Sequence, residues 1–123
     1  MSKNTKFGTL YIVATPIGNL NDITARALEV LSSVDFCAAE NTRKSKVLFN
    51  NYQIKTKLVS YHKYSEDKKL DLLIKNLKQG KNIALISDAG TPLISDPGYL
   101  LVKEARKEFI DVIPIPGPSS ITS

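Results

Sequence analysis

The sequence predicts an α/β fold in which a five-stranded parallel sheet is covered by helices on both faces. Short apolar runs alternate strictly with stretches of helical periodicity, and this alternation is typical of right-handed βαβ units. The chain has 123 residues, which is enough for one domain with a buried core but not for two. Hydrophobic residues make up 42% of the chain and charged residues 24%, so a disordered protein is excluded.

Each predicted strand is a short apolar run that ends at polar or turn-forming residues. The runs GTLYIVA and NIALI are the most apolar, and we expect these two strands to be buried. The run KLVS is the weakest of the five. In chain order, the predicted strands are Gly8–Ala14, Val34–Ala39, Lys57–Ser60, Asn82–Ile86 and Asp111–Pro114.

The predicted helices are recognised by apolar residues three and four positions apart and by capping residues at their ends. The first helix has either Asn21 or Asp22 as its expected N-cap, and Ile23 is expected to share its apolar face. The second helix is short and basic. The helices are expected over residues 22–33, 42–50 and 65–79 and from residue 96 onward.

The third and fourth helices have the clearest ends. Ser65 is the expected N-cap of the third helix, and Gly80 is its expected stop. Asp96 and Pro97 open the fourth helix. The apolar face of the third helix is Leu70, Leu73, Ile74 and Leu77, and that of the fourth is either Leu101, Ala105 and Phe109 or Val102 and Ala105.

Basic residues are concentrated in the middle third of the chain. Residues 43–81 hold 11 Lys and Arg against 3 Asp and Glu, and the remainder holds 6 against 9, so the net charge of +5 divides into +8 and −3. The same segment contains Tyr52, Tyr61, Tyr64 and His62. Cations with interleaved aromatic residues are typical of nucleic-acid binding, and the alternative is a solvated lysine-rich surface.

Several classes of protein are excluded. A single cysteine, Cys37, rules out a disulfide framework and a cysteine-built zinc site, and a single histidine, His62, argues against a metal site. No apolar run has the length of a membrane span, and the start, MSKNTKFG, has no signal-peptide core. We therefore expect a cytoplasmic protein with neither a metal nor a membrane partner.

Three loops that follow predicted strands are rich in Gly and Pro. They are TPIGN at residues 15–19, SDAGTPLISDPG at 87–98 and PIPGPSS at 114–120. Because open parallel sheets bind ligands at the carboxyl ends of their strands, these loops predict a ligand site. Neither a G-x-G-x-x-G motif nor a Walker A loop is present, so nicotinamide cofactors and P-loop chemistry are disfavoured. Asp88 is either a ligand-binding carboxylate or part of a structural turn, whereas Asp96 is interpreted as a helix cap.

Taken together, VATPIGNLNDIT, AENTR, SDAGTPLISDPG and PIPGPSS resemble the ribosomal RNA small-subunit methyltransferase I family, within the tetrapyrrole-methylase superfamily. The resemblance implies S-adenosylmethionine-dependent 2′-O-methylation of a decoding-centre cytidine in 16S rRNA of the small ribosomal subunit. It also implies strand order 3-2-4-1-5 and a homodimer. Residues 1–117 would be the N-terminal methyltransferase domain, with flavodoxin-like layering, and residues 118–123 the start of a connection to a C-terminal domain. We expect the chain to have little activity alone.

The resemblance also implies a set of cofactor-binding residues. Thr91 stands where many superfamily members have Asp, which leaves Asp88 as the carboxylate for a polar contact. Asn41 stands where the family usually has Asp and cannot act as a carboxylate. The implied contacts to S-adenosylmethionine are Pro16, Ile17, Gly18, Asp88, Gly90, Thr91, Ile94, Ser119 and Ser120.

A ribose hydroxyl is a weak nucleophile, so methyl transfer to it gains from a base. Asp88, Glu40 and His62 are the candidate catalytic residues. The predicted RNA-binding residues are Arg43, Lys44, Lys46, Lys63, Lys68 and Lys69. Two other functions remain open, namely methylation of a tetrapyrrole or another small molecule, and a non-catalytic RNA- or nucleotide-binding module.

Overall fold

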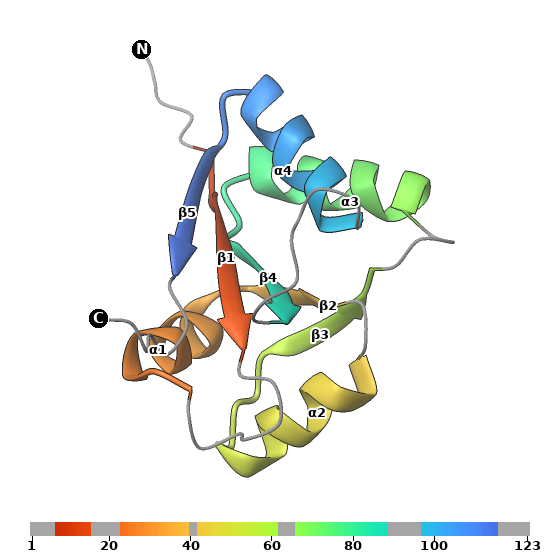
Figure 1. Cartoon of the computed structure of the whole chain (residues 1–123). Helices are drawn as coiled ribbons and strands as arrows, with labels where there is room; N and C mark the ends of the chain where they lie inside the picture. The colour runs from red at the N-terminus through yellow and green to blue at the C-terminus, as the bar shows by residue number, and fades with distance from the viewer. Residues whose placement is uncertain (1–6, 16–22, 40–41, 62–65, 89–96, 116–123) are drawn as a thin grey trace, which may run out of the picture.

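A computed structural model describes residues 7–15, 23–39, 42–61, 66–88 and 97–115. Five strands and four helices alternate strictly within these ranges (Figure 1). All strand pairs within these ranges are parallel, and the order β3-β2-β4-β1-β5 confirms the predicted fold class and strand order. The elements are β1 (Thr9–Thr15), α1 (Ala25–Ser33), β2 (Phe36–Ala39), α2 (Thr42–Asn51), β3 (Lys57–Ser60), α3 (Glu66–Lys78), β4 (Ile83–Asp88), α4 (Pro97–Lys107) and β5 (Asp111–Ile115).

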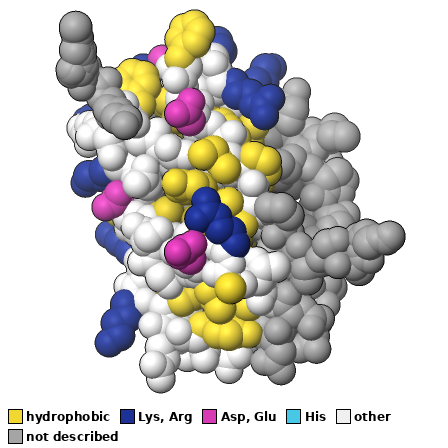
Figure 2. Space-filling model, turned by 90° about the vertical axis from the view of Figure 1, so that its left-hand side faces the viewer, with side chains coloured by type: hydrophobic (Ala, Val, Ile, Leu, Met, Phe, Trp, Pro, Cys, Tyr) yellow, Lys and Arg dark blue, Asp and Glu magenta, His cyan; other side chains and the backbone are white. Residues whose placement is uncertain are grey.

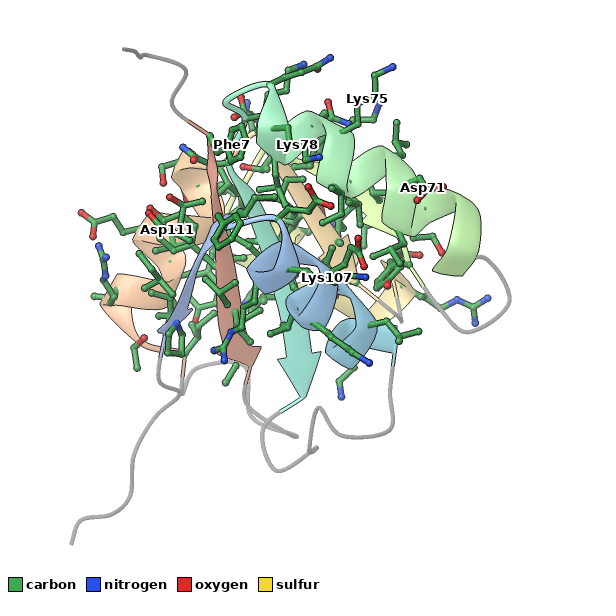
Figure 3. The ribbon with its side chains drawn as sticks, turned by 90° about the horizontal axis from the view of Figure 1, so that it is seen from above. Phe7, Asp71, Lys75, Lys78, Lys107 and Asp111 are labelled. Atoms are coloured by element: carbon green, nitrogen blue, oxygen red, sulfur yellow. The ribbon has the colours of Figure 1, made fainter. Side chains whose placement is uncertain are left out.

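The helices cover the sheet in two layers. Helices α1 and α2 lie on one face, and α3 and α4 lie side by side on the other (Figure 1). Each face has its own apolar core, and β2 contributes to both, since Cys37 belongs to the first core and Ala38 to the second. On the outside of the second layer, Lys78 Nζ lies 2.6 Å from Glu108 Oε1 and joins α3 to the residues after α4 (Figure 3).

The start of α1 differs from the prediction. Its N-cap is Thr24, whose Oγ1 accepts a hydrogen bond from the Ala27 N–H at 3.1 Å. Ile23 is 8% exposed and packs in the α1–α2 core although it precedes the helix. The spacing that placed Ile23 on the apolar face of the helix therefore reflects its burial in the same core and not its membership of the helix. Asn21 and Asp22, the expected caps, lie outside the described residues.

The end of α4 corrects the expectation that Phe109 forms part of its apolar face. Phe109 has φ 63° and is 89% exposed, whereas Ile110 is 3% exposed. The Ile110 N–H bonds to the Ala105 carbonyl at 2.9 Å, and the Phe109 N–H bonds to the Arg106 carbonyl at 3.1 Å. This pattern is a Schellman motif, which places the left-handed residue outside the helix and turns the following apolar residue into the core.

Phe109→Gly is therefore expected to raise the free energy of unfolding by about 1 kcal/mol, because a left-handed backbone costs an L side chain about that much. The exposed ring has little packing to lose. Denaturant unfolding measures the change. Lys103→Gly, at an exposed position within α4, is the matched control and is expected to lower stability by about 1 kcal/mol. A Phe109→Gly variant that is less stable than the parent chain would contradict this account of the helix end.

Strand β5 forms one edge of the sheet and pairs only with β1. Hydrophobic side chains gather on the face of the molecule that carries this edge (Figure 2). Phe7, Phe109 and Ile113 are the large apolar residues exposed in this region. Pro114 lies within β5 and has no N–H to offer to another strand, which makes the edge a poorer template for further pairing.

Candidate functional site

The strands from which the three Gly- and Pro-rich loops depart end at one edge of the sheet. Thr15, the last residue of β1, pairs in parallel register with Asp88, the last residue of β4. Ile115 at the end of β5 pairs with Val13, and Ala39 at the end of β2 pairs with Ile86. The carboxyl edge of the sheet therefore brings together the starts of all the predicted loops.

The helices that follow β1 and β4 lie on opposite faces of the sheet. Strand β1 is followed by α1, which packs in one core, and β4 is followed by α4, which packs in the other (Figure 1). A point at which neighbouring strands connect to opposite faces is where open parallel sheets bind ligands. The Thr15–Asp88 pair marks that point here.

Asp88 is the one predicted cofactor-binding or catalytic residue that falls within the described ranges. The sequence placed it in a loop, whereas the structure places it at the end of β4. The ladder to β1 continues through Ser87 and Asp88, which extends the strand by two residues. The other predicted cofactor-binding and catalytic residues lie outside the described residues; they are Pro16, Ile17, Gly18, Glu40, His62, Gly90, Thr91, Ile94, Ser119 and Ser120.

Helix α2 presents a positively charged surface next to this edge. Arg43, Lys44 and Lys46 are all exposed, whereas its opposite side is buried through Ser45, Leu48 and Phe49. Residues 42–61 contain five cations and no acidic residue. Because α2 follows β2, its first turn lies at the carboxyl edge, beside the ends of β2 and β4.

The other predicted RNA-binding residues belong to the opposite face. Lys68 and Lys69 lie in the first turn of α3, and Lys69 is half-buried. Lys63 lies outside the described residues. Since α3 follows β3, its first turn is also at the carboxyl edge, but on the side of the sheet away from α2. The predicted cations therefore flank the edge instead of forming one patch.

The aromatic residues of the basic segment do not serve as expected. Tyr61 is 1% exposed, packs in the α3–α4 core and donates its backbone N–H to the Ala39 carbonyl at 2.9 Å. Tyr52 is half-buried and packs against the other core. Tyr61 is therefore a core residue rather than a surface on which bases stack. The spacing of apolar residues around the short strand β3 did not indicate this burial. Tyr64 and His62 lie outside the described residues.

The described part of the chain contains no candidate for a metal site or a reactive thiol. No group of three or more His, Cys, Asp or Glu within it is arranged to hold a metal ion, and none of its helices has the length and hydropathy of a membrane span. Burial raises the pKa of the Cys37 thiol to about 12, so Cys37 is not a nucleophile at neutral pH.

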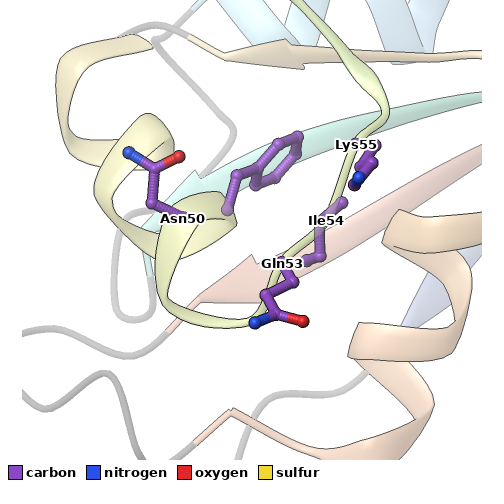
Figure 4. A pocket seen from close by; sticks show the side chains of 5 residues that line it. Asn50, Gln53, Ile54 and Lys55 are labelled. Carbon is purple, nitrogen blue, oxygen red and sulfur yellow. The ribbon is translucent and has the colours of Figure 1, made fainter.

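A pocket is present elsewhere, at the end of α2. It is open to solvent and lined by Phe49, Asn50, Gln53, Ile54 and Lys55 (Figure 4). Helix α2 runs away from the carboxyl edge, so this pocket lies toward the amino ends of the strands. It is separate from the Thr15–Asp88 pair and is not the predicted cofactor site.

The chain matches a protein-family model and several curated proteins over most of its length. The family model described as Tetrapyrrole (Corrin/Porphyrin) Methylases matches residues 9–123. The chain is 55% identical over 113 residues to Ribosomal RNA small subunit methyltransferase I of Mycoplasmopsis pulmonis, covering 92% of this chain and 51% of that protein. It is 58% identical over 110 residues to the Haemophilus influenzae protein of the same name, covering 89% and 39%. The chain thus spans about half, or less, of these relatives.

Solved structures share the fold. Cobalt precorrin-4 methyltransferase superposes with a TM-score of 0.71 at 18% identity, covering 91% of this chain and 46% of that one. Uroporphyrin-III C-methyltransferase from Thermus thermophilus, complexed with S-adenosyl homocysteine, gives 0.66 at 16% identity, covering 92% and 46%. At these identities, the likeness concerns the fold alone.

Proposed function

This chain belongs to the family of Tetrapyrrole (Corrin/Porphyrin) Methylases, and we propose that it is part of an S-adenosylmethionine-dependent enzyme that methylates 16S ribosomal RNA. The observation that carries the proposal is the identity of 55% and 58% to two proteins named as small-subunit ribosomal RNA methyltransferases. The proposed product is a 2′-O-methylated cytidine in the decoding centre. We place the reaction in the cytoplasm, on the small ribosomal subunit, with the enzyme as a homodimer.

The proposed cofactor site is the carboxyl edge at β1, β4 and β5. S-adenosylmethionine, when bound, supplies an electrophilic methyl group. The Thr15–Asp88 pair supports this location, because the helices that follow these two strands, α1 and α4, lie on opposite faces of the sheet. Residues 16–18, 90–94 and 119–120 follow the ends of β1, β4 and β5 and are proposed to surround the cofactor.

The proposed base is Asp88, with Glu40 and His62 as the alternatives. A ribose 2′-hydroxyl needs to lose its proton as it attacks the methyl group, and a carboxylate within hydrogen-bond reach accepts that proton. Asp88 is favoured because the β4 ladder to β1 fixes its backbone at the carboxyl edge. Holding hydroxyl and methyl group in line contributes a further part of the rate acceleration.

The proposed path of the RNA crosses α2. Its exposed Arg43, Lys44 and Lys46 lie in a segment without acidic residues, and cations of this kind bind phosphates. These cations are spread over an exposed helix, an arrangement that favours an extended polyanion such as RNA over a small tetrapyrrole as the substrate. It gives the proposal support that is independent of the relatives' names.

Transfer of labelled methyl groups tests the proposed function. The full-length protein is incubated with labelled S-adenosylmethionine and with small ribosomal subunits that lack the modification, and the label is mapped by nucleotide. Incorporation at one cytidine ribose of 16S RNA is the expected result. A parallel incubation replaces the ribosomal subunits with a tetrapyrrole, and labelling there but not in RNA would establish the alternative activity of the family.

Replacing Arg43 and Lys44 together by Ala in the full-length protein is expected to weaken RNA binding. Each lost phosphate contact lowers the slope of log affinity against log salt by about 0.7–0.9, so the slope falls by between one and two units. Fluorescence anisotropy with labelled RNA at several salt concentrations measures it. Cofactor affinity is expected to stay unchanged, since the proposed contacts come from other segments.

The matched control for this variant removes one Lys and one Arg from α4, as Lys103→Ala with Arg106→Ala. Both residues are exposed and lie on the opposite face of the sheet from α2. Salt slopes that are the same in both double variants, and equal to that of the parent, would show that the α2 cations only solubilise the domain.

A further inference from the structure

A second group of cations lies at the amino edge of the sheet, opposite the proposed active site. Lys57 is the first residue of β3, and it pairs in register with Phe36, the first residue of β2. Phe36 in turn pairs with Ile83 at the start of β4, which brings Lys81 into the same region. Lys55 precedes β3 and lines the pocket at the end of α2 (Figure 4).

Two of these lysines converge on one aromatic ring. The Nζ atoms of Lys57 and Lys81 lie 6.0 Å and 5.6 Å from the centroid of the Phe36 ring. The ring attracts each ammonium group and holds both in place. Within the described residues no ion pair involves either lysine, so an anion between them would relieve their mutual repulsion.

No carboxylate of the described residues neutralises this group. The ion pairs in the described ranges join Arg26 to Glu29, Lys78 to Glu108 and Lys107 to Glu104, and none includes Lys55, Lys57 or Lys81. Asp35 Oδ2 accepts a hydrogen bond from the Asn82 N–H at 2.9 Å, so one carboxylate lies near the lysines without an ion pair to them, and the group keeps a net positive charge. The three ammonium groups therefore remain available to an external anion.

The group continues the positive surface of α2. Helix α2 has ten residues and a length of about 15 Å, so it spans much of the distance between the carboxyl and amino edges. Residues 42–61 run along α2 and then along the edge strand β3 with five cations and no acid. Positive charge thus extends from Arg43 beside the proposed active site to Lys57 at the other end of the sheet.

We propose that Lys55, Lys57 and Lys81 form a second RNA-binding site, which holds the phosphate backbone about 15 Å from the nucleotide that is methylated. The inference rests on the proposed function, because it takes RNA as the substrate. RNA fits better than an acidic protein partner, since protein interfaces depend on buried apolar or aromatic anchors. Of the large hydrophobic residues exposed in the described ranges, Val47, Leu72 and Ile113 lie within α2, α3 and β5, and Phe7 and Phe109 precede β1 and β5, so none belongs to β2, β3 or β4.

The site predicts a dependence on the length of the RNA. A tetranucleotide with the target cytidine at a central position extends about two stacked nucleotides, or about 7 Å, to either side, so it reaches the α2 cations but not the amino edge. An RNA of about 30 nucleotides reaches both. Affinity for the longer RNA should therefore depend on Lys57 and Lys81, and affinity for the tetranucleotide should not.

The test compares the parent with a double variant of the full-length protein that carries both Lys57→Ala and Lys81→Ala. The double variant is expected to bind the longer RNA about tenfold more weakly, with the salt slope lowered by about 1.4 for two single-strand phosphates. Binding of the tetranucleotide is expected to stay as in the parent. Lys57→Arg with Lys81→Arg keeps the charge and is expected to keep the affinity.

Two controls separate this site from other causes. The α4 variant Lys103→Ala with Arg106→Ala loses the same charge, so an equal loss of affinity there would show a general charge effect and overturn the site. Thermal unfolding checks that the loss of the contacts to Phe36 has not unfolded the domain. If the Ala variant is unfolded, the Lys57→Arg, Lys81→Arg variant is compared with the parent in its place. Unchanged affinity of the Ala variant for the longer RNA, with methyl transfer to RNA by the parent intact, would overturn the second site alone. Absence of methyl transfer by the parent would overturn the proposed function.

Discussion

Replacing Asp88 by Asn is expected to slow methyl transfer by about 10²–10⁴-fold, the range typical of removing a general base. Asn has nearly the same shape but does not accept the proton of the ribose hydroxyl. The main chain at this position is held by the ladder of β4 to β1, in which Asp88 pairs with Thr15. The fold should therefore persist, and the rate constant at saturating RNA and cofactor is the quantity to measure.

The pH dependence distinguishes a base from a residue that only positions substrate. A base works when deprotonated, so the rate of the parent should rise with pH through the pKa of that group, and the Asp88→Asn variant should lose this rise. Asp111→Asn is the matched control, because Asp111 is exposed at the amino edge, at the start of β5. Glu40→Gln and His62→Asn test the alternatives. Full activity of Asp88→Asn, with a large loss in one of these two, would assign the base to that residue.

The fold was predictable because the apolar pattern of each segment and the strict alternation of strands and helices indicate the same parallel sheet. The run KLVS at Lys57–Ser60 was predicted with its correct bounds, although it is the weakest strand. Helix ends were less predictable. Gly80 has φ 94° and ends α3 as expected, but Gln53 and Phe109 adopt φ 57° and 63° at the ends of α2 and α4 without a glycine to indicate it. There, burial of Ile54 and Ile110 outweighs the local backbone preference.

The candidate site was predictable to the level of the sheet edge. The carboxyl ends of parallel strands lie at one edge, and the pairing of Thr15 with Asp88 shows this for the ends of β1 and β4, from which two of the loops start. The amino-edge cluster was not predictable, because Phe36, Lys57 and Lys81 are far apart in sequence. They come together through the register of β2 with β3 and β4, which no local pattern encodes.

Gly8→Ala is expected to lower the free energy of unfolding by about 3 kcal/mol, the upper part of the range for an overpacked site. A Cβ atom on Gly8 would lie 1.8 Å from the Lys81 carbonyl oxygen and 2.4 Å from its carbonyl carbon. Both are main-chain atoms, so the clash cannot be relieved by a side-chain rotation. The strand entry and the turn after α3 would have to separate.

That separation would break a set of hydrogen bonds that closes the amino edge. The Gly8 N–H bonds to the Leu77 carbonyl at 2.7 Å, and the Thr9 N–H bonds to Asn82 Oδ1 at 2.9 Å. The Asp35 N–H bonds to the Asn82 carbonyl at 2.9 Å, which ties β2 to the same turn. Each such bond contributes about 1 kcal/mol, and a donor left buried without a partner costs more.

Denaturant unfolding of the Gly8→Ala variant measures the loss, and Gly80→Ala in the same turn is the matched comparison. Gly80 has φ 94°, so its replacement is expected to cost about 1–2 kcal/mol through backbone strain alone. A larger loss of stability at Gly8 than at Gly80 would show that position 8 requires glycine because two main-chain segments approach closely there, and not because of glycine's backbone flexibility. Equal losses in the two variants would mean that the turn moves freely away from β1. In that case the Lys81 ammonium would not be held over Phe36 as the structure describes, and the second RNA-binding site would lose its rigid support.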